Sequence, residues 1–144
     1  MTKAAIARFD KNAVAQAEQY LAHPGGEETD PRVEQLVNDL IGRIADKWTL
    51  LVLEELEEKG VTRFSDLGRG VAGISQKMLT QTLRQMERDG LVTRTVHPVV
   101  PPRVDYALTP LGESLSAAFC GVWIWADRHR EAVEAARAAF DARG

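Results

Sequence analysis

The chain has 144 residues, of which 44% are hydrophobic and 27% are charged, so it is long enough for one domain with an appended helical element. No apolar run approaches the ~20 residues that span a membrane, and the N-terminal segment lacks the apolar core of a secretory signal peptide. The single cysteine, Cys120, excludes an intrachain disulfide and a multi-cysteine metal site. We therefore expect a cytoplasmic protein without a membrane segment, a metal or another cofactor.

The net charge of −3 argues against a uniformly basic protein, but the charges are unevenly distributed. Residues 61–103 carry 7 basic and 3 acidic groups, a net charge of +4, whereas residues 1–60 and 104–144 are acidic overall. Affinity for DNA depends on such a local basic surface, because counterions are displaced at the contact. A chance cluster of solvated charges is the competing interpretation, and the charge pattern alone does not decide between the two.

Three helices are predicted in the first part of the chain. Residues 3–22 are rich in alanine and predict a helix that ends before the breaker His23-Pro24-Gly25-Gly26. Apolar residues then recur at helical spacing from Val33 to Ile44, which predicts an amphipathic helix. The next helix begins near Trp48, an expected core anchor, and stops near Gly60. Because it is apolar on several faces, we expect it at the centre of the domain.

A small strand at residues 61–64 precedes a pair of helices. Residues 65–69 predict a short helix that Gly70 ends. Ser75 offers an N-cap hydroxyl for a second helix, which runs to about Asp89 and stops at Gly90. One face of this second helix is apolar. Its other face is polar and cationic and carries Gln76, Lys77, Thr80, Gln81 and Arg84.

Two further strands and a long helix complete the chain. Residues 91–96 and 104–108 have the β-branched and aromatic content of strands. Three prolines between them prevent pairing with a further strand, so we expect a hairpin with a protruding loop that carries His97 and Arg103. Thr109-Pro110 predicts the start of a long helix. Its apolar stripe is longer than so small a domain can cover, which predicts a dimer interface.

This order of elements is that of a winged helix-turn-helix. We expect a mainly α-helical fold with a small β-wing and terminal dimerisation helices, divided as residues 1–30, an N-terminal helix and linker; 31–109, a DNA-binding domain; and 110–144, a C-terminal dimerisation helix. The second helix of the pair has the dimensions and side chains to enter a DNA major groove. The expected DNA-binding residues are Ser75, Gln76, Lys77, Thr80, Gln81 and Arg84 on that helix and His97 and Arg103 on the wing.

Several sequence blocks occur together in a fixed order. They are Asp46-Lys47-Trp48-Thr49-Leu50-Leu51-Val52-Leu53, Arg63-Phe64-Ser65-Asp66-Leu67, Ile74-Ser75-Gln76-Lys77-Met78-Leu79-Thr80, Leu83-Arg84, Asp89-Gly90-Leu91-Val92 and Pro98-Val99-Val100-Pro101-Pro102-Arg103-Val104-Asp105-Tyr106. In these blocks the chain closely resembles the HxlR family of MarR-like regulators over residues 33–125. The resemblance implies a dimeric DNA-binding repressor or activator that responds to electrophiles, oxidants or small metabolites. Many members carry a sensing cysteine before the first helix of the domain, where this chain has Gln35, so thiol sensing at that position is excluded.

We therefore expect a sequence-specific DNA-binding transcriptional regulator, a repressor that acts as a homodimer on an inverted-repeat operator. Gln81 suits a bidentate contact with adenine and Arg84 with guanine, whereas Lys77 suits a phosphate. An enzyme is a poor fit, because the sequence shows no nucleophile–base pair, carboxylate dyad or glycine-rich phosphate loop. The alternative is a winged helix used only for protein contacts, which would expose apolar or acidic residues on the helix after Ser75.

The C-terminal helix holds the candidate effector-binding residues, Phe119, Cys120, Trp123 and Trp125. A dimer core is the competing and simpler interpretation of these aromatic residues. The neighbours of Cys120 supply no charge that would lower its pKa, so an inert buried thiol is favoured over a redox role. The three histidines share no ligand spacing, and we expect no metal site.

Overall fold

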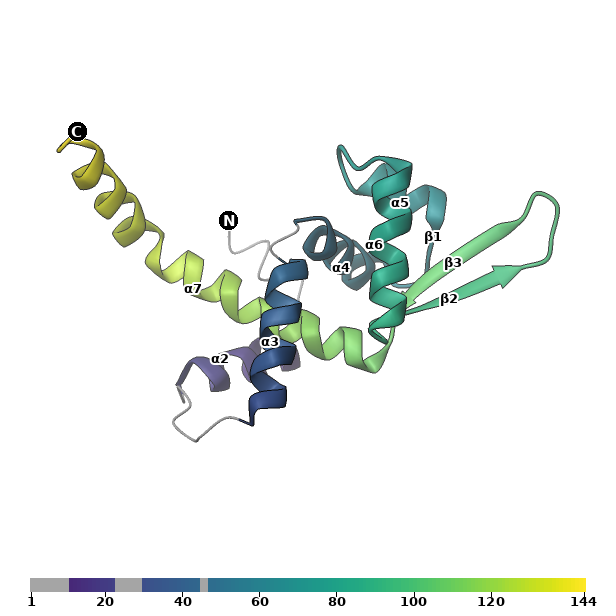
Figure 1. The fold of residues 1–144 in the computed structure, drawn as a ribbon, viewed down its shortest axis with the longest axis horizontal. Coiled ribbons are helices and arrows are strands. Elements are labelled where there is room, and N and C mark those ends of the chain that lie inside the picture. The colour runs from purple at the N-terminus through teal and green to yellow at the C-terminus, as the bar shows by residue number, and fades with distance from the viewer. Residues whose placement is uncertain (1–10, 23–29, 45–46) are drawn as a thin grey trace. The chain divides into compact units, whose positions relative to one another are not determined.

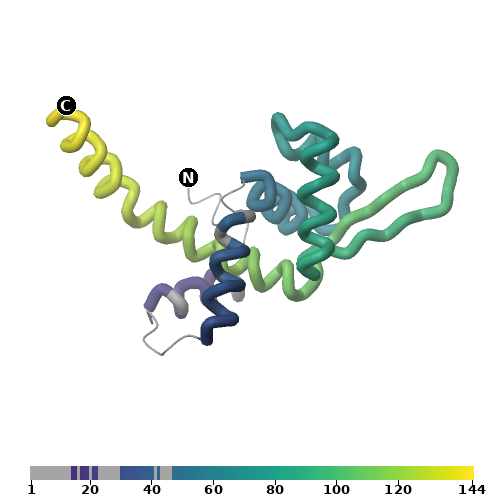
Figure 2. The backbone as a smooth tube through the Cα atoms, in the orientation of Figure 1, coloured from purple at the N-terminus to yellow at the C-terminus, as the bar shows by residue number. Residues whose placement is uncertain are grey.

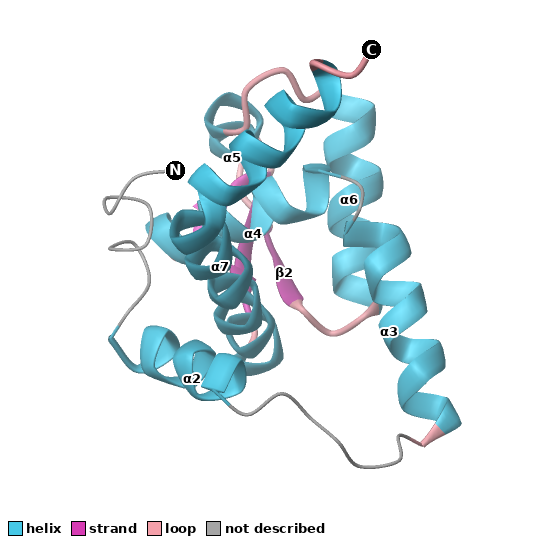
Figure 3. Ribbon diagram, turned by 90° about the vertical axis from the view of Figure 1, so that its left-hand side faces the viewer, coloured by secondary structure: helices cyan, strands magenta, loops and turns pink. Residues whose placement is uncertain are grey.

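The computed structural model of the chain describes residues 11–22, 30–44 and 47–144 (Figure 1). Its elements are mainly helices with one small sheet, which confirms the predicted fold class (Figure 3). By their contacts the residues form two compact units, Gly25–Ser116 and Met1–Pro24 with Ala117–Gly144. The predicted helical residues 3–10 and the breaker at residues 23–26 lie outside the described residues.

The unit Gly25–Ser116 begins with α3 (Pro31–Ile44) and α4 (Lys47–Lys59). The carboxylate of Asp30 caps α3 by accepting a hydrogen bond from the backbone N–H of Arg32 at 2.8 Å. The central position predicted for α4 is confirmed, since it buries Val52, Leu53 and Leu56. Trp48 is only half-buried, and the Lys47 ammonium lies 4.4 Å from the centroid of its ring.

A helix pair follows the short strand β1 (Thr62–Arg63), namely α5 (Phe64–Gly70) and α6 (Gln76–Arg88). Ser75 is the N-cap of α6, and its Oγ accepts a hydrogen bond from the backbone N–H of Met78 at 3.0 Å. The helix ends in a Schellman motif, in which Gly90 has a φ of 76° and the N–H of Leu91 donates to the carbonyl of Met86. Both ends of α6 therefore lie where the sequence predicts. The helix buries Leu79, Thr82, Leu83 and Met86.

The sheet has the order β1-β3-β2 and is antiparallel throughout. Strand β2 (Val92–His97) pairs with β3 (Arg103–Leu108) from the Val92–Leu108 pair to the His97–Arg103 pair. The two strands run side by side and project from the helices as a hairpin that ends in the loop at residues 98–102 (Figure 2). The hairpin prediction is confirmed, but the positions of His97 and Arg103 differ from it. Both lie in the last paired positions of the strands, at the root of the loop.

The last helix, α7 (Pro110–Asp141), begins as the Thr109-Pro110 pair predicts. The Thr109 Oγ1 accepts a hydrogen bond from the N–H of Gly112 at 3.0 Å and donates to the carbonyl of Gly90 at 2.5 Å. A side chain at Gly112 would overlap the backbone oxygen of Leu91. Glycine is required here because the first turn of α7 lies directly against the backbone that follows α6.

The second unit consists of α2 (Lys11–Ala22) and the rest of α7. Its core is a small cluster of Ala17 from α2 with Cys120 and Ile124 from α7, flanked by Val14 and Trp123. Gly121 of α7 lies beside Ala17, where a Cβ would make an ordinary contact with the Ala17 Cβ at 3.8 Å. An exposed ion pair, Arg128 to Glu18 at 3.1 Å, adds a polar contact between the two helices.

The predicted apolar stripe of α7 is only partly covered. Its part-buried members are Leu115, Phe119, Ala126 and Val133. Its exposed members are Leu111, Val122, His129 and Phe140. Over the described ranges of the chain, no helix combines the length and apolar character needed to cross a membrane.

Candidate nucleic-acid interface

The unit Gly25–Ser116 contains a groove of about 920 Å³ between α6, the start of α5 and the hairpin. We call it the basic groove, because its charged lining residues are four arginines and a single carboxylate, that of Glu87. The arginines are Arg63 of β1, Arg84 of α6, Arg94 of β2 and Arg103 of β3. Four different elements thus bring positive charge to one concave surface, which favours a polyanionic partner.

The polar face predicted for α6 is exposed as a whole. Two hydroxyls bond to the backbone of the helix itself, since the Ser75 Oγ before the face caps α6 and the Thr80 Oγ1 on the face donates to the carbonyl of Gln76 at 2.8 Å. The side chains of Lys77, Gln81 and Arg84 make no hydrogen bond or ion pair with other described residues. These three side chains therefore present their donors to solvent, as contact with base edges in a major groove requires.

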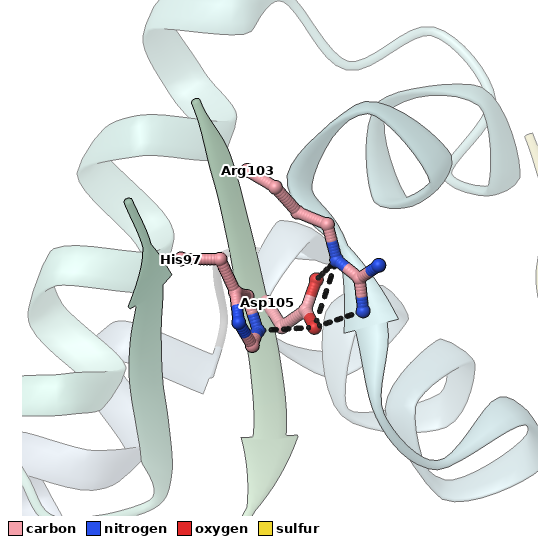
Figure 4. A network of polar contacts seen from close by, with 3 residues as sticks. All are labelled: His97, Arg103 and Asp105. Atoms are coloured by element: carbon pink, nitrogen blue, oxygen red, sulfur yellow. Dashed lines mark hydrogen bonds and ion pairs between the residues drawn. The ribbon is translucent and has the colours of Figure 1, made fainter. Parts of the chain in front are cut away.

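His97 and Arg103 meet at the carboxylate of Asp105, which they approach from two sides (Figure 4). Arg103 donates from Nε to both carboxylate oxygens, at 3.1 and 3.2 Å, and from Nη2 to Oδ2 at 2.8 Å. The Nε2 of His97 lies 3.0 Å from the same Oδ2. We call these three residues the wing-root cluster. The Asp105 side chain is only 5% exposed, whereas those of Arg103 and His97 are 42% and 40% exposed.

The contacts in the wing-root cluster shift the pKa values of Asp105 and Arg103. Hydrogen bonds from Arg103 lower the pKa of Asp105 against the opposing effect of burial, and the contact with His97 acts in the same direction. The same hydrogen bonds raise the pKa of Arg103. Asp105 is therefore ionised and Arg103 is cationic at neutral pH, so the pair is a charge-assisted bidentate contact.

The sequence interpretation did not identify three residues of this surface. Neither Arg63 nor Arg94 was among the residues expected to bind DNA, yet both line the basic groove. Asp105 was assigned no role. The sequence contained a signal for it, because an acidic residue two positions after an arginine on the same strand lies on the same face as that arginine.

The four predicted effector residues lie in the second unit, where the structure separates them. Cys120 is fully buried, and burial raises the pKa of its thiol. Trp123 packs against the same cluster, and Phe119 is half-buried. Trp125 is 48% exposed and stacks on His129, with ring centroids 4.9 Å apart.

An apolar pocket of about 480 Å³ opens between α2 and α7 within this unit. It is lined by Ala17, Leu21, Ala118, Gly121, Val122 and Trp125. Of the four predicted residues, Trp125 belongs to this lining, whereas Phe119, Cys120 and Trp123 do not. Within the described segments, no three histidine, cysteine or acidic side chains are grouped as they would be around a metal ion.

Comparison with known sequences points to one family. The HxlR-like helix-turn-helix family matches residues 43–134. An HTH-type transcriptional regulator of Escherichia coli, YtfH, is 41% identical over 99 residues, which are 69% of this chain and 78% of the relative. An HTH-type transcriptional regulator of Methanothermobacter thermautotrophicus is 42% identical over 96 residues, 67% of this chain and 72% of the relative.

Solved structures show the same relationship. A transcriptional regulator of Salmonella typhimurium, also named ytfH, is 39% identical with a TM-score of 0.63 and covers 76% of this chain and 98% of its own. The reduced form of the Bacillus subtilis transcriptional regulator YodB is 32% identical with a TM-score of 0.59, over 70% and 94% of the two chains. The redox regulator HypR in its reduced form is 33% identical with a TM-score of 0.60, over 69% and 97%.

Proposed function

The chain belongs to the HxlR-like helix-turn-helix family of DNA-binding transcriptional regulators, and from this premise we propose that it is a repressor that binds an inverted-repeat operator as a homodimer. The observation that carries the proposal is the basic groove beside the exposed polar face of α6. We place the protein in the cytoplasm, where the bacterial chromosome lies. The members of this family are named as transcriptional regulators, and we propose no enzymatic activity for this chain.

Helix α6 is the element that reads base edges. Arg84 lines the basic groove from α6, and its guanidinium is suited to the O6 and N7 atoms of guanine, as the Gln81 amide is to adenine. Lys77 lies in the first turn, close to the N-terminal end of the helix dipole, where a phosphate is favoured. Base specificity thus rests on the middle of α6 and phosphate contact on its start.

The wing supplies contacts that are independent of sequence. Arg63, Arg94 and Arg103 come from the three strands and belong to the lining of the basic groove. The strands hold these side chains on a rigid sheet, so they suit backbone phosphates at fixed spacing rather than a variable base. His97 joins this surface through the wing-root cluster.

The terminal helices support the homodimer. In the second unit large apolar side chains remain in solvent, with Leu21 39% exposed, Val122 59% and Phe140 73%. A second copy of the chain would bury such a surface by two-fold symmetry. Two α6 helices would then lie about one DNA turn apart, ~34–36 Å, and read an inverted repeat.

The apolar pocket between α2 and α7 supports regulation by a small apolar effector. Its lining includes the exposed indole of Trp125, which offers a flat surface to an aromatic ligand. A ligand that prefers one arrangement of the terminal helices would shift the population of DNA-binding dimers. A thiol switch at Cys120 is not part of the proposal, because that thiol is buried and its pKa is raised.

Selection of bound duplexes from a random DNA pool tests the function directly. We expect enrichment of an inverted repeat, and fluorescence anisotropy should then show tighter binding to the full repeat than to one half-site. A chain that enriches no sequence, and that binds partner proteins instead, would establish the winged helix as a protein-interaction module. Equal affinity for the half-site and the full repeat would contradict the homodimer.

A further inference from the structure

The wing-root cluster places a nearly buried carboxylate in contact with the guanidinium of Arg103 and the imidazole of His97. Arg103 and Asp105 are two positions apart on β3 and therefore on one face. His97 is the register partner of Arg103, and Arg63 is the register partner of Asp105. Directly opposed residues of antiparallel strands share a face, so all four side chains leave the sheet on the same side.

The geometry of the Arg103–Asp105 contact leaves part of the guanidinium available. Asp105 accepts from Nε and Nη2, which are on one edge of the guanidinium. No hydrogen bond within the described residues uses Nη1. The side chain is 42% exposed and Arg103 belongs to the lining of the basic groove, so its remaining donors are accessible to a partner.

An arginine side chain has many rotamers, and fixing one of them on binding costs conformational entropy. Two charge-assisted hydrogen bonds to a buried carboxylate fix Arg103 before any partner arrives. Such preorganisation increases affinity, because less ordering remains to be done in the complex. If the Arg103–Asp105 contact served only to stabilise the hairpin, the Arg103 side chain would not need to be 42% exposed.

We propose that Asp105 is a positioning residue that holds the Arg103 guanidinium in the pose in which it binds a DNA backbone phosphodiester. This inference rests on the proposed DNA-binding function and names a contact within it. His97 supports the same carboxylate from the neighbouring strand. The phosphodiester is the expected ligand because the cluster lies on the wing, away from the base-reading face of α6.

Positioning and simple electrostatics predict opposite signs for Asp105→Asn. Removing a negative charge from a DNA-binding surface makes that surface more basic, and electrostatics alone predicts tighter binding. Positioning predicts weaker binding despite the gain in positive charge. If the substitution leaves the binding pose populated about a tenth of the time, affinity falls about tenfold.

Fluorescence anisotropy on the selected operator duplex measures this effect in the full-length protein. We expect Asp105→Asn to bind about tenfold more weakly than the original chain. In an Arg103→Ala background, the same substitution should no longer weaken binding, because Asp105 acts through Arg103. Equal or tighter binding by Asp105→Asn in the original background would overturn the inference.

If Asp105→Asn fails to fold, a second variant tests whether the bidentate contact positions Arg103. Arg103→Lys keeps the positive charge but cannot make the side-on bidentate contact. We expect it to lose most of the affinity that Arg103→Ala loses, whereas retention of the original affinity would contradict positioning. Circular dichroism and thermal unfolding show which variants are folded. A folded original chain that binds no duplex at all would refute the proposed function itself, which is a separate outcome.

Discussion

The two units differ in where their polar and apolar side chains lie. In Gly25–Ser116 the apolar residues of α4 and α6 are buried, and four arginines surround a groove on the surface. In the second unit, residues 1–24 and 117–144, hereafter the terminal unit, the buried cluster is small, and large apolar side chains such as Val122 and Trp125 stay exposed. A closed core with a basic face suits a charged partner, whereas uncovered apolar side chains suit assembly or an apolar ligand.

The salt dependence of operator affinity should distinguish substitutions in the two units most strongly. Because we propose that DNA binds in the basic groove, operator affinity should fall on the order of a thousandfold between about 50 and about 200 mM salt. Arg94→Ala should reduce the slope of this dependence by about one charge. Arg137→Ala, an exposed cation of α7, is the matched control and should leave the slope unchanged. If Arg94→Ala and Arg137→Ala change the salt dependence of affinity equally, the DNA contacts are not confined to the basic groove.

Breaking the apolar surface of the terminal unit should give the next largest effect. Val122→Asp with Trp125→Asp puts charges on exposed apolar positions of α7 and should produce a monomer by light scattering. Affinity for the inverted repeat should fall by about a hundredfold, because the second half-site is no longer bound intramolecularly. Ala132→Asp, at an exposed small residue of the same helix, is the control. A double variant that stays dimeric would show that this surface is not the interface.

Within the DNA-binding unit, substitutions on α6 should separate base reading from phosphate binding. Arg84→Ala should cost about 1–3 kcal/mol of binding free energy and relax the preference at one base position. Lys77→Ala should weaken binding to all duplexes alike. Repeating the random-pool selection with each variant distinguishes the two results. If Arg84→Ala leaves the selected sequence unchanged, another residue reads that base.

Acid should reduce the stability that the wing-root cluster contributes to the folded chain. The pKa of Asp105 is lowered in the folded chain from its ordinary value of 3.8, chiefly by hydrogen bonds from Arg103. A lowered folded-state pKa stabilises the protein above the unfolded-state value, and this contribution is lost as the pH falls through the folded-state value. Below about pH 4, thermal stability should therefore decline more steeply in the original chain than in Asp105→Asn. Parallel declines would show that Asp105 makes no such contribution.

The smallest effect is expected from oxidation of the terminal unit. Cys120 is fully buried, and its thiol has a raised pKa, so little reactive thiolate forms at neutral pH. Treatment with diamide should leave operator affinity unchanged, as it should in a Cys120→Ala variant. A loss of affinity in the original chain that Cys120→Ala abolishes would instead make Cys120 a redox sensor.

Much of the DNA-binding unit could be predicted from the sequence because its signals are local. The hydroxyl of Ser75 and the positive φ of Gly90 define the ends of α6, and each acts within a few residues of chain. The division of α6 into a buried and a polar face follows from helical periodicity alone. The proline-rich loop likewise separates two strands without reference to any distant residue.

Residues whose roles depend on pairing could not be placed in this way. His97 and Arg103 were expected on a protruding loop, and strand register places them as a pair at its root. The aromatic residues of α7 were grouped by sequence, but the position of α2 decides which of them pack with Ala17 and which line the pocket. Neighbouring positions on one helix point in different directions, so residues that are close in the sequence of α7 do not all line the same pocket.

The sequence by itself thus determined the order of the elements, the caps of α6 and α7, the polar face of α6 and the basic character of residues 61–103. Those properties depend on backbone preferences and on periodicity, which act over a few residues. Only the tertiary structure decided that Asp105 meets Arg103 and His97 and that four arginines from four elements share one groove. Such contacts depend on strand register and helix packing, which join residues that the sequence keeps apart.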